Sequence, residues 1–166
     1  MCETLRPAEA AEVDAVFALL ERRVRWTART GIGQWDAGYL AAYPRDYFAS
    51  QQARGNLYVL RERGRLAAAV VLLSQDDRWP DGRAVPAFYV HNLMTDPDCR
   101  GAGVRLLSKA ADLALQTGKT ALRLDCAETS GFLNRYYEEL GFVLRGRCQD
   151  GPYRGNRREK RLSPRE

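Results

Sequence analysis

The chain lacks any apolar run that approaches the roughly 20 residues needed to span a bilayer. It also lacks, at its N-terminus, the basic and then apolar pattern of a secretory signal. These two absences predict a protein without a membrane-spanning helix and favour a cytoplasmic location. With 166 residues and 45% hydrophobic side chains, the chain has enough apolar material for one core, so we predict a single domain over residues 1–166.

Histidine and paired cysteines are equally scarce. The sequence contains one histidine, His91, and four cysteines, none of which forms a CxxC pair. Metal sites and disulfide frameworks both need such residues at characteristic spacings, so neither is predicted. We therefore expect reduced thiols, among which Cys99 stands out because it lies beside a glycine-rich segment.

Acidic residues are outnumbered by basic ones, which gives a formal net charge of +5. A basic protein raises the question of nucleic-acid binding. Much of the excess lies from Arg145 onward, however, and the sequence carries no helix-turn-helix pattern, no paired RNA-binding aromatic residues and no zinc module. We therefore do not predict a nucleic-acid partner, and interpret the basic C-terminal segment as a solvated surface or as an attraction for a polyanionic cofactor.

Hydrophobic periodicity and turn residues give the order of the secondary structure. Apolar residues recur at helical spacing after Pro7, which predicts a long amphipathic helix that runs toward Trp26 and is broken at residues 31–33. The segment from Ala67 to Leu73 is apolar on both faces, as expected of a buried central strand. This order predicts an α/β fold whose mixed sheet has helices on both faces. The other expected elements are strands at 4–6, 56–60, 65–73, 87–95 and 121–126, a hairpin turn at 62–64, a surface loop at 75–86, helical segments at 38–52 (interrupted at 44), from about 104 and at 134–140, and a final strand pair turned at 151–152.

The segment from Asp98 to Gly103 lies between a strand and a helix and carries two glycines separated by one residue. Glycine lets the backbone approach a ligand closely, and the first N–H groups of a helix are unpaired donors at the positive end of its dipole. The segment therefore predicts a phosphate-binding loop, although a tight turn alone would also explain the two glycines.

A second segment, from Tyr137 to Phe142, reads Tyr-Glu-Glu-Leu-Gly-Phe and stops a short helix at a glycine. Together with the glycine-rich loop, it resembles the GNAT superfamily of acyl-CoA-dependent N-acetyltransferases. That family combines a strand ending in Leu-x-Val, a loop of the form Gln/Arg-x-x-Gly-x-Gly/Ala and a Tyr-Glu-x-Leu-Gly-Phe segment. The resemblance covers Ala87 to Phe142 closely and the rest of the chain more loosely.

The loop departs from the family pattern in either of two registers. If Arg100 is the first basic position, Arg105 stands where a small residue is expected. If Gly101 and Gly103 are the motif glycines, Asp98 replaces the usual Gln or Arg. The spacing to the following helix favours the second register, in which Arg100 and Arg105 supply the positive charge that Asp98 does not.

The resemblance implies both a fold and a cofactor. It specifies a GNAT-like mixed sheet of six or seven strands, splayed between the fourth and fifth strands where acetyl-CoA, the acetyl donor, enters. The pantetheine arm would pair with the end of the fourth strand as an added strand does. Either Ser130 or Asn134 would contact the cofactor near the start of the later helix. The implied cofactor-binding residues are Leu93, Met94, Thr95, Cys99, Arg100, Gly101, Ala102, Gly103, Val104, Arg105, Ser130, Asn134 and Tyr137.

Transfer to an amine requires a base and an acid, since an amine resembling that of lysine is mostly protonated at neutral pH. His91 is the candidate base, because strand alternation places it on the same face as Leu93 and Thr95, where the family often has a glutamate. The alternative is that His91 is a structural strand residue and that water relays the proton. Tyr137 matches the family's tyrosine that protonates the departing thiolate, and Tyr136 competes for that role.

The acceptor is the least specified part of the resemblance. Its pocket is implied near the N-terminal helices, the central strand and the last hairpin. An indole ring can face a cation and a carboxylate can pair with an ammonium group, although indoles also simply fill the space under a loop. The candidate acceptor residues are Trp26, Trp35, Asp36 and Glu128.

We therefore predict an acyltransferase, an N-acetyltransferase that moves the acetyl group of acetyl-CoA to the primary amine of a small molecule by direct attack in a ternary complex. Acetylation of a protein lysine or N-terminus is the alternative within the same enzyme class. A non-catalytic acyl-CoA-binding regulatory module is the alternative from another class. We expect no metal ion and no membrane to take part, and leave a homodimer open.

Overall fold

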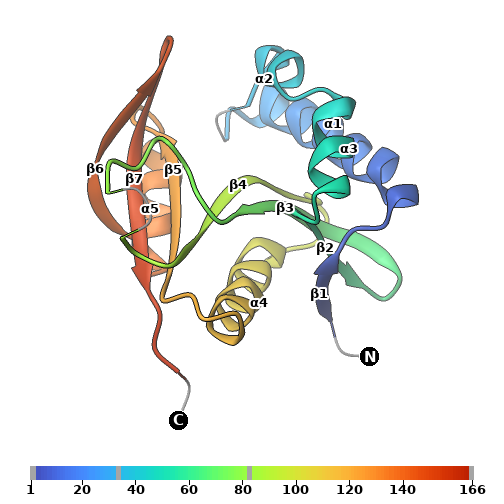
Figure 1. Ribbon diagram of the computed structural model, residues 1–166. Coiled ribbons are helices and arrows are strands. Elements are labelled where there is room, and N and C mark those ends of the chain that lie inside the picture. Colours follow the sequence, from blue (N-terminus) through green and yellow to red (C-terminus); the bar gives the residue numbers. More distant parts are fainter. Residues whose placement is uncertain (1–2, 33–34, 82–83, 165–166) are drawn as a thin grey trace. The chain divides into compact units, whose positions relative to one another are not determined.

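The computed structural model describes residues 3–32, 35–81 and 84–164. Figure 1 shows the order of the elements along the chain. The strands are β1 (Thr4–Pro7), β2 (Leu57–Glu62), β3 (Arg65–Leu73), β4 (Ala87–Thr95), β5 (Ala121–Ala127), β6 (Val143–Asp150) and β7 (Tyr153–Arg161). The helices are the 3-10 turn η1 (Ala10–Glu12), α1 (Val13–Thr30), α2 (Ala37–Ala42), α3 (Arg45–Ala53), α4 (Ala102–Gln116) and α5 (Gly131–Glu139). Within the described ranges, no helix is both long and apolar enough to cross a membrane.

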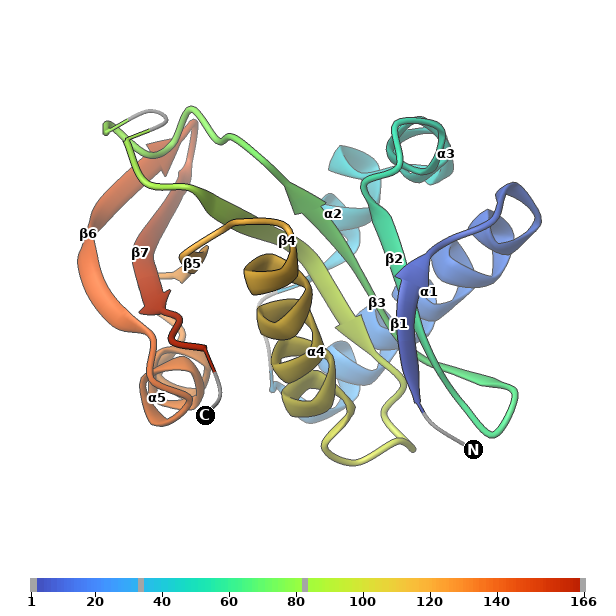
Figure 2. The same cartoon turned by 60° about the horizontal axis from the view of Figure 1, so that its bottom comes forward.

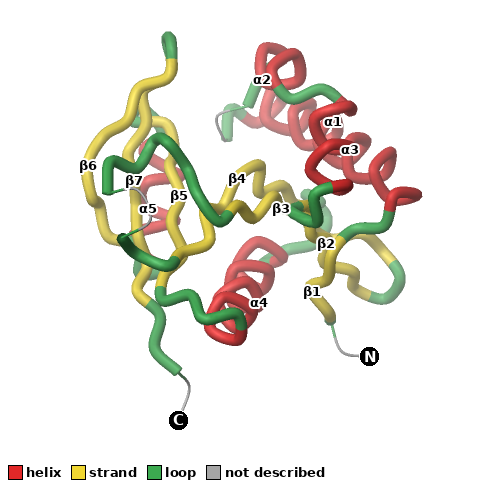
Figure 3. The backbone as a smooth tube through the Cα atoms, viewed as in Figure 1, coloured by secondary structure: helices red, strands yellow, loops and turns green. Residues whose placement is uncertain are grey.

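The strands form one mixed sheet in the order β1-β2-β3-β4-β5-β7-β6, drawn in yellow in Figure 3. This seven-stranded sheet and its flanking helices confirm the predicted α/β fold. The chain divides into two compact units. Unit 1 comprises Met1–Leu72 and His91–Lys109, and unit 2 comprises Leu73–Val90 and Ala110–Glu166. The single domain expected over the whole chain stays a prediction.

In unit 1, β1, β2 and β3 pair antiparallel and can be followed side by side in Figure 2. β2 and β3 form the predicted hairpin, whose turn residues Arg63 and Gly64 have φ angles of 51° and 78°. Two successive left-handed residues give a turn whose twist matches that of the flanking strands. From Ala67 to Leu72, β3 is buried, as its apolar sequence predicted.

The helices of unit 1 follow the apolar pattern with one difference. In α1, Val16 and Leu20 are fully buried, and the helix ends at Gly31, which has a φ of 70° and donates its N–H to the Thr27 carbonyl at 2.8 Å. This left-handed cap confirms the predicted break at Gly31. The difference lies at the start, because the helix predicted to begin after Pro7 begins at Val13, after the 3-10 turn η1.

The second helical segment is divided, as predicted, where proline cannot continue the α2 backbone. Pro44 becomes the N-cap of α3. The new helix packs against α1, with the ring centroids of Phe17 and Phe48 6.4 Å apart.

In unit 2, β4 and β5 run parallel from the pair Ala87↔Ala121 to the pair Tyr89↔Arg123, and β7 lies antiparallel between β5 and β6. Figure 1 shows α5 beside β5, against which it packs. The predicted strand pair with its turn at 151–152 is confirmed. The splaying expected between the fourth and fifth strands stays a prediction.

The described residues of the segment 75–86 (75–81 and 84–86) form a loop, as predicted, but they do not lie wholly at the surface. Trp79 is only 4% exposed and packs in a cluster that includes Tyr89. The guanidinium carbon of Arg123 lies 4.3 Å from the centroid of the Trp79 ring, and the same guanidinium donates to both carboxylate oxygens of Asp81, at 2.8 and 2.7 Å. A cation over an indole face, together with this double hydrogen bond, fastens the loop to β5.

Candidate functional site

The glycine-rich loop of unit 1 turns tightly into α4. The Cys99 N–H donates to the Asp96 carbonyl at 2.9 Å, and the Ala102 N–H donates to the Cys99 carbonyl at 3.2 Å. Gly101 has a φ of +76°, and a Cβ atom there would lie 2.9 Å from a guanidinium nitrogen of Arg105. The positive φ therefore favours glycine at 101, and an added Cβ atom would in addition displace the end of the Arg105 side chain.

The helix begins at Ala102, so the N–H groups of Gly103 and Val104 belong to its first turn. N–H groups in this turn have no carbonyl partner within the helix, and they lie at the positive end of its dipole. Gly103 is buried and Val104 is exposed. The loop and the first turn of α4 thus have the donors that an anionic group needs.

Arg105 braces the loop from within unit 1. Its guanidinium donates to Glu62 at 2.8 and 2.5 Å and to the Arg100 carbonyl at 2.9 Å, and it lies 3.4 Å from a Glu3 oxygen. Glu62 and Glu3 thus balance the positive charge of Arg105, which the sequence led us to expect at a bound phosphate. Direct contact of Arg105 with the cofactor stays a prediction, while its hold on the loop backbone is a role that the sequence did not indicate.

Two carboxylates precede the glycines, and both are paired with arginine. Asp96 has a side chain that is only 1% exposed and accepts from Arg22 at 2.7 Å and from Arg65 at 2.6 Å. Asp98 lies 3.2 Å from the same Arg65 and donates its own N–H to the Asp96 carboxylate at 2.9 Å. Burial alone would raise the pKa of Asp96, but the Asp98 N–H and the two guanidinium groups outweigh it and lower that pKa. The negative charge of Asp98, the acidic residue of the loop, is therefore balanced by Arg65.

The strand that leads into this loop contains the candidate base. His91, Leu93 and Thr95 are half-buried, whereas Asn92 and Met94 between them are buried. This exposure pattern agrees with the alternation expected of a strand. Asn92 nevertheless has a φ of +54°, so the regular backbone is interrupted at the residue next to the histidine. The sequence gave no sign of this interruption beyond the presence of an asparagine, which tolerates the left-handed region better than most residues.

In unit 2, the candidate acid Tyr137 lies on the buried side of α5. Its ring makes edge-on contacts with Phe142 and Tyr136, with centroid separations of 5.7 and 5.2 Å. Burial, with smaller contributions from neighbouring groups, raises the pKa of Tyr137 above its ordinary value. The hydroxyl therefore keeps its proton at neutral pH, as a proton donor must. The competing Tyr136 is half-buried and stacks on Phe132 at 6.3 Å.

Ser130 and Asn134 both make contacts within unit 2. Ser130 is the N-cap of α5, and its hydroxyl accepts from the Leu133 N–H at 3.2 Å. The side-chain amide of Asn134 donates to the carbonyls of Ala127 and Ser130 at 3.0 and 2.8 Å, and its oxygen accepts from Arg158 at 3.2 Å. Asn134 thus ties α5 to two strands with both of its N–H groups in use. Contact of either residue with the cofactor stays a prediction.

The four candidate acceptor residues have different surroundings. The Arg23 guanidinium lies 4.2 Å above the ring of Trp26, so a cation of the protein itself already covers that indole. Asp36 is the N-cap of α2 and accepts from the Tyr39 N–H at 3.2 Å. Trp35 stacks on the ring of Tyr39 with a centroid separation of 4.4 Å. In unit 2, Glu128 lies 3.5 Å from an Arg147 nitrogen.

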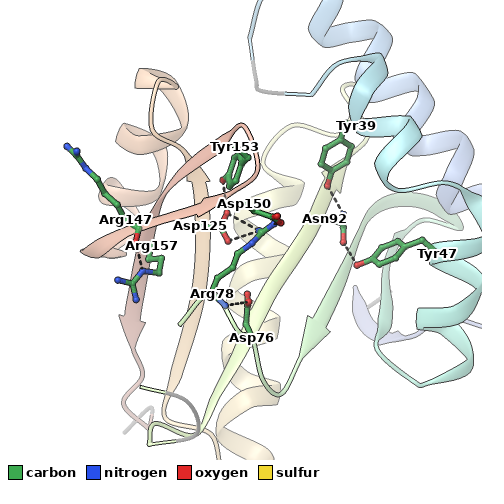
Figure 4. A network of polar contacts seen from close by, with 10 residues as sticks. All are labelled: Tyr39, Tyr47, Asp76, Arg78, Asn92, Asp125, Arg147, Asp150, Tyr153 and Arg157. Carbon is green, nitrogen blue, oxygen red and sulfur yellow. Dashed lines mark hydrogen bonds and ion pairs between the residues drawn. The ribbon is translucent and has the colours of Figure 1, made fainter. Parts of the chain in front are cut away.

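Unit 2 also contains a polar cluster that the sequence did not predict, drawn in Figure 4 around Arg78. Arg78 lies 2.8 Å from an Asp150 oxygen and 3.3 Å from an Asp125 oxygen, and the Tyr153 hydroxyl donates to Asp125 at 2.6 Å. Burial and the neighbouring carboxylate of Asp125 raise the pKa of Tyr153. The aspartate in the largely buried strand β5 was the one available signal, because its partners are distant in the sequence.

The described residues offer no group of three or more histidine, cysteine, aspartate or glutamate side chains that could hold a metal ion. The three cysteines in these ranges, Cys99, Cys126 and Cys148, are free. Burial raises the pKa of Cys126 to about 11, which makes this thiol a poor nucleophile at neutral pH.

Comparison with known proteins agrees with these features. Residues 20–142 match the model of the Acetyltransferase (GNAT) family. The chain is 29% identical over 152 residues to YesJ of Bacillus subtilis strain 168, an uncharacterized N-acetyltransferase, with 87% of this chain and 84% of that protein covered. A GNAT-family acetyltransferase of Listeria monocytogenes 4b F2365 has a similar crystal structure, with a TM-score of 0.79, 22% identity and coverage of 96% and 95% of the two chains.

A second similar structure is the PaiA N-acetyltransferase of Thermoplasma acidophilum, solved in complex with coenzyme A. It has a TM-score of 0.69, 15% identity and coverage of 98% of this chain and 100% of that chain. The match to the family model includes the glycine-rich loop, all of α5 and the Leu-Gly-Phe that follows this helix. Family membership makes the protein an acyltransferase with acetyl-CoA as its acetyl donor. The chain thus belongs to the GNAT acetyltransferase family.

Proposed function

We propose that the protein transfers the acetyl group of acetyl-CoA to the primary amine of a small molecule, by direct attack within a ternary complex. The observation that carries this proposal is the turn at Gly101, where a left-handed glycine leads into the first turn of α4. Backbone N–H groups at such a turn suit the pyrophosphate of coenzyme A. The pairing of Asp98 with Arg65 supports the fit, because it offsets the only carboxylate within the loop from 98 to 103.

The residues of unit 1 would bind the cofactor in two ways. The backbone from Cys99 to Val104 would hold the pyrophosphate, with Arg100 adding charge and Arg105 keeping the loop in shape through its bond to the Arg100 carbonyl. The backbone of Leu93, Met94 and Thr95 would hold the pantetheine arm. The bound cofactor supplies an activated thioester.

Two side chains would handle protons. Tyr137 would hold a proton at its hydroxyl and give it to the departing thiolate. His91 is half-buried on β4 and would take the proton from the substrate ammonium group at an imidazole nitrogen. Removing that proton is required because only the neutral amine attacks a carbonyl carbon.

A small-molecule acceptor is the finer part of the proposal. The half-buried pair Trp35 and Tyr39 provides aromatic faces that suit a cationic or apolar acceptor. Asp36 would act there through its cap of α2. Trp26 and Glu128, which have arginine partners within the protein, would contribute less directly.

Release of the coenzyme A thiol tests this function, measured with acetyl-CoA across polyamines, aminoglycosides, amino acids and peptides. Release that depends on a small amine, and that Gly103→Glu abolishes, is the expected result, because a carboxylate at the helix N-terminus repels the pyrophosphate. Release with peptides alone would identify a protein acetyltransferase and refute the proposed acceptor. Stabilisation of the protein by coenzyme A without any release would point to a non-catalytic binding module.

A further inference from the structure

The backbone of β4 contains a feature that an uninterrupted strand would not have. Asn92 has a φ of +54° in the middle of a nine-residue strand and is buried. Among the described residues, the other non-glycine residue with a positive φ is Arg63, which lies in a hairpin turn where that conformation is expected. A side chain makes the left-handed region unfavourable, although less so for asparagine than for most residues, so the surroundings of Asn92 help to enforce this conformation.

Two tyrosines of unit 1 supply that enforcement, as Figure 4 shows. The Tyr47 hydroxyl, on α3, donates to the Asn92 Oδ1 atom at 2.8 Å. The Asn92 Nδ2 group donates to the hydroxyl of Tyr39, on α2, at 2.6 Å. The carboxamide therefore has a hydrogen-bond partner on each side. Aspartate in this place would lose the donor, and alanine would lose both bonds.

The tyrosines are themselves held by an aromatic row. The ring of Tyr43 lies 4.7 Å from that of Tyr39 and 4.9 Å from that of Tyr47, and Trp35 stacks on the other side of Tyr39. No residue of α2 within the described chain is buried. The aromatic row and the bond to Asn92 hold this short helix together with its contacts to α1.

A left-handed residue turns the peptide groups on either side of it away from the directions of a regular strand. The neighbours of Asn92 are His91, our proposed base, and Leu93, whose backbone we propose for cofactor binding. Relaxation of Asn92 to an extended conformation would redirect both, even if the sheet stayed folded.

We propose that Tyr39 and Tyr47 are positioning residues that act through Asn92. They hold residue 92 in the left-handed conformation and so set the direction of the His91 side chain and of the Leu93 amide. This inference rests on the proposed function, because it assigns a catalytic consequence to the clamp.

The test compares two replacements of the same asparagine. Asn92→Ala removes both hydrogen bonds and disfavours a positive φ, so kcat should fall by about ten-fold, which corresponds to about 1.4 kcal/mol. Asn92→Gly also removes both bonds but adopts a positive φ readily, so most of kcat should return. Tyr47→Phe should lower kcat in the wild-type background and have little further effect in the Asn92→Gly background. Arg63→Gly, at the other left-handed site, is the matched control and should leave kcat unchanged.

Melting temperature, recorded for every variant, separates positioning from packing. Both replacements at 92 should lower it, whereas only alanine should strongly lower kcat. Equal loss of kcat in the alanine and glycine variants would overturn the inference, and so would an unchanged kcat in the alanine variant. These comparisons use a wild-type protein that is active in the amine panel. A wild-type protein without transfer would refute the proposed function, and the catalytic role of the clamp with it.

Discussion

Replacement of Gly101 by alanine is a sharp test of the cofactor loop, because the added methyl group has two separable effects. The φ of +76° is unfavourable for any residue with a Cβ atom, and the new atom would lie 2.9 Å from Arg105 Nη1. The guanidinium must then move, which endangers its 2.9 Å hydrogen bond to the Arg100 carbonyl.

The magnitude follows from these two costs. A left-handed alanine costs roughly 1 to 2 kcal/mol, and the lost hydrogen bond about 1 kcal/mol. The free protein can lower this cost by relaxing the loop. Binding of coenzyme A must then restore the strained loop, so the cost appears as weaker binding. If about 2 kcal/mol is involved, the dissociation constant for coenzyme A rises by about thirty-fold.

Calorimetric titration with coenzyme A measures this effect, and Gly118→Ala provides a matched control. Gly118 has a similar φ of +79° but no atom within 4 Å of its added Cβ, and it lies at the far end of α4. Both variants should melt a few degrees lower, at about 2 to 4 °C per kcal/mol for a chain of this size. Only Gly101→Ala should bind coenzyme A more weakly. Wild-type affinity in a folded Gly101→Ala variant would refute our account of the loop.

Three further predictions concern protons. Tyr137→Phe should retain coenzyme A affinity but lower turnover by about ten-fold or more, and unchanged turnover in a reaction limited by chemistry would exclude the acid role. His91→Gln should lower turnover by about ten-fold or more, because a carboxamide cannot take the proton from the substrate ammonium group; wild-type turnover in a folded variant would return His91 to a structural role. Hydrogen bonding to Arg6, opposed by burial and aided by further donors, lowers the pKa of Glu12 to about 2. The pKa of Glu12 is lower in the folded state than in the unfolded state, so its stabilisation of the fold is present above about pH 4.5 and is lost as the pH falls toward 2. Glu12→Gln should therefore lower the free energy of unfolding at neutral pH by about 2 kcal/mol. Chemical denaturation at several pH values should show that this difference becomes smaller in acid.

Much of the fold could be predicted because its signals are local. The turn at Gly64, the break at Pro44 and the apolar run of β3 each depend on a few neighbouring residues. The glycine at 31 correctly marked the end of α1. The start was less exact, because the helix predicted to begin after Pro7 begins at Val13, after the 3-10 turn η1. Local patterns are thus sufficient for the order of elements and less so for their ends.

The side-chain environment of the site was less accessible to sequence reasoning. Arg78 and Asp125 lie 47 positions apart, and no periodic pattern links them. The loop glycines were recognisable because backbone conformation restricts the residue type at Gly101. Asn92, by contrast, is held in its conformation by two tyrosines from other elements, so its role depends on tertiary contacts that local sequence does not encode.

The most direct test of the central claim follows the acetyl group itself. The protein is incubated with acetyl-CoA labelled with ¹³C in the acetyl carbonyl and with the best amine of the panel, and both the amine and the protein are then analysed by mass spectrometry. Direct transfer predicts that the label appears on the nitrogen of the small amine, in step with thiol release, and that the protein remains unlabelled. Label that stays on the protein before reaching the amine, or that reaches only peptide acceptors, would contradict the account.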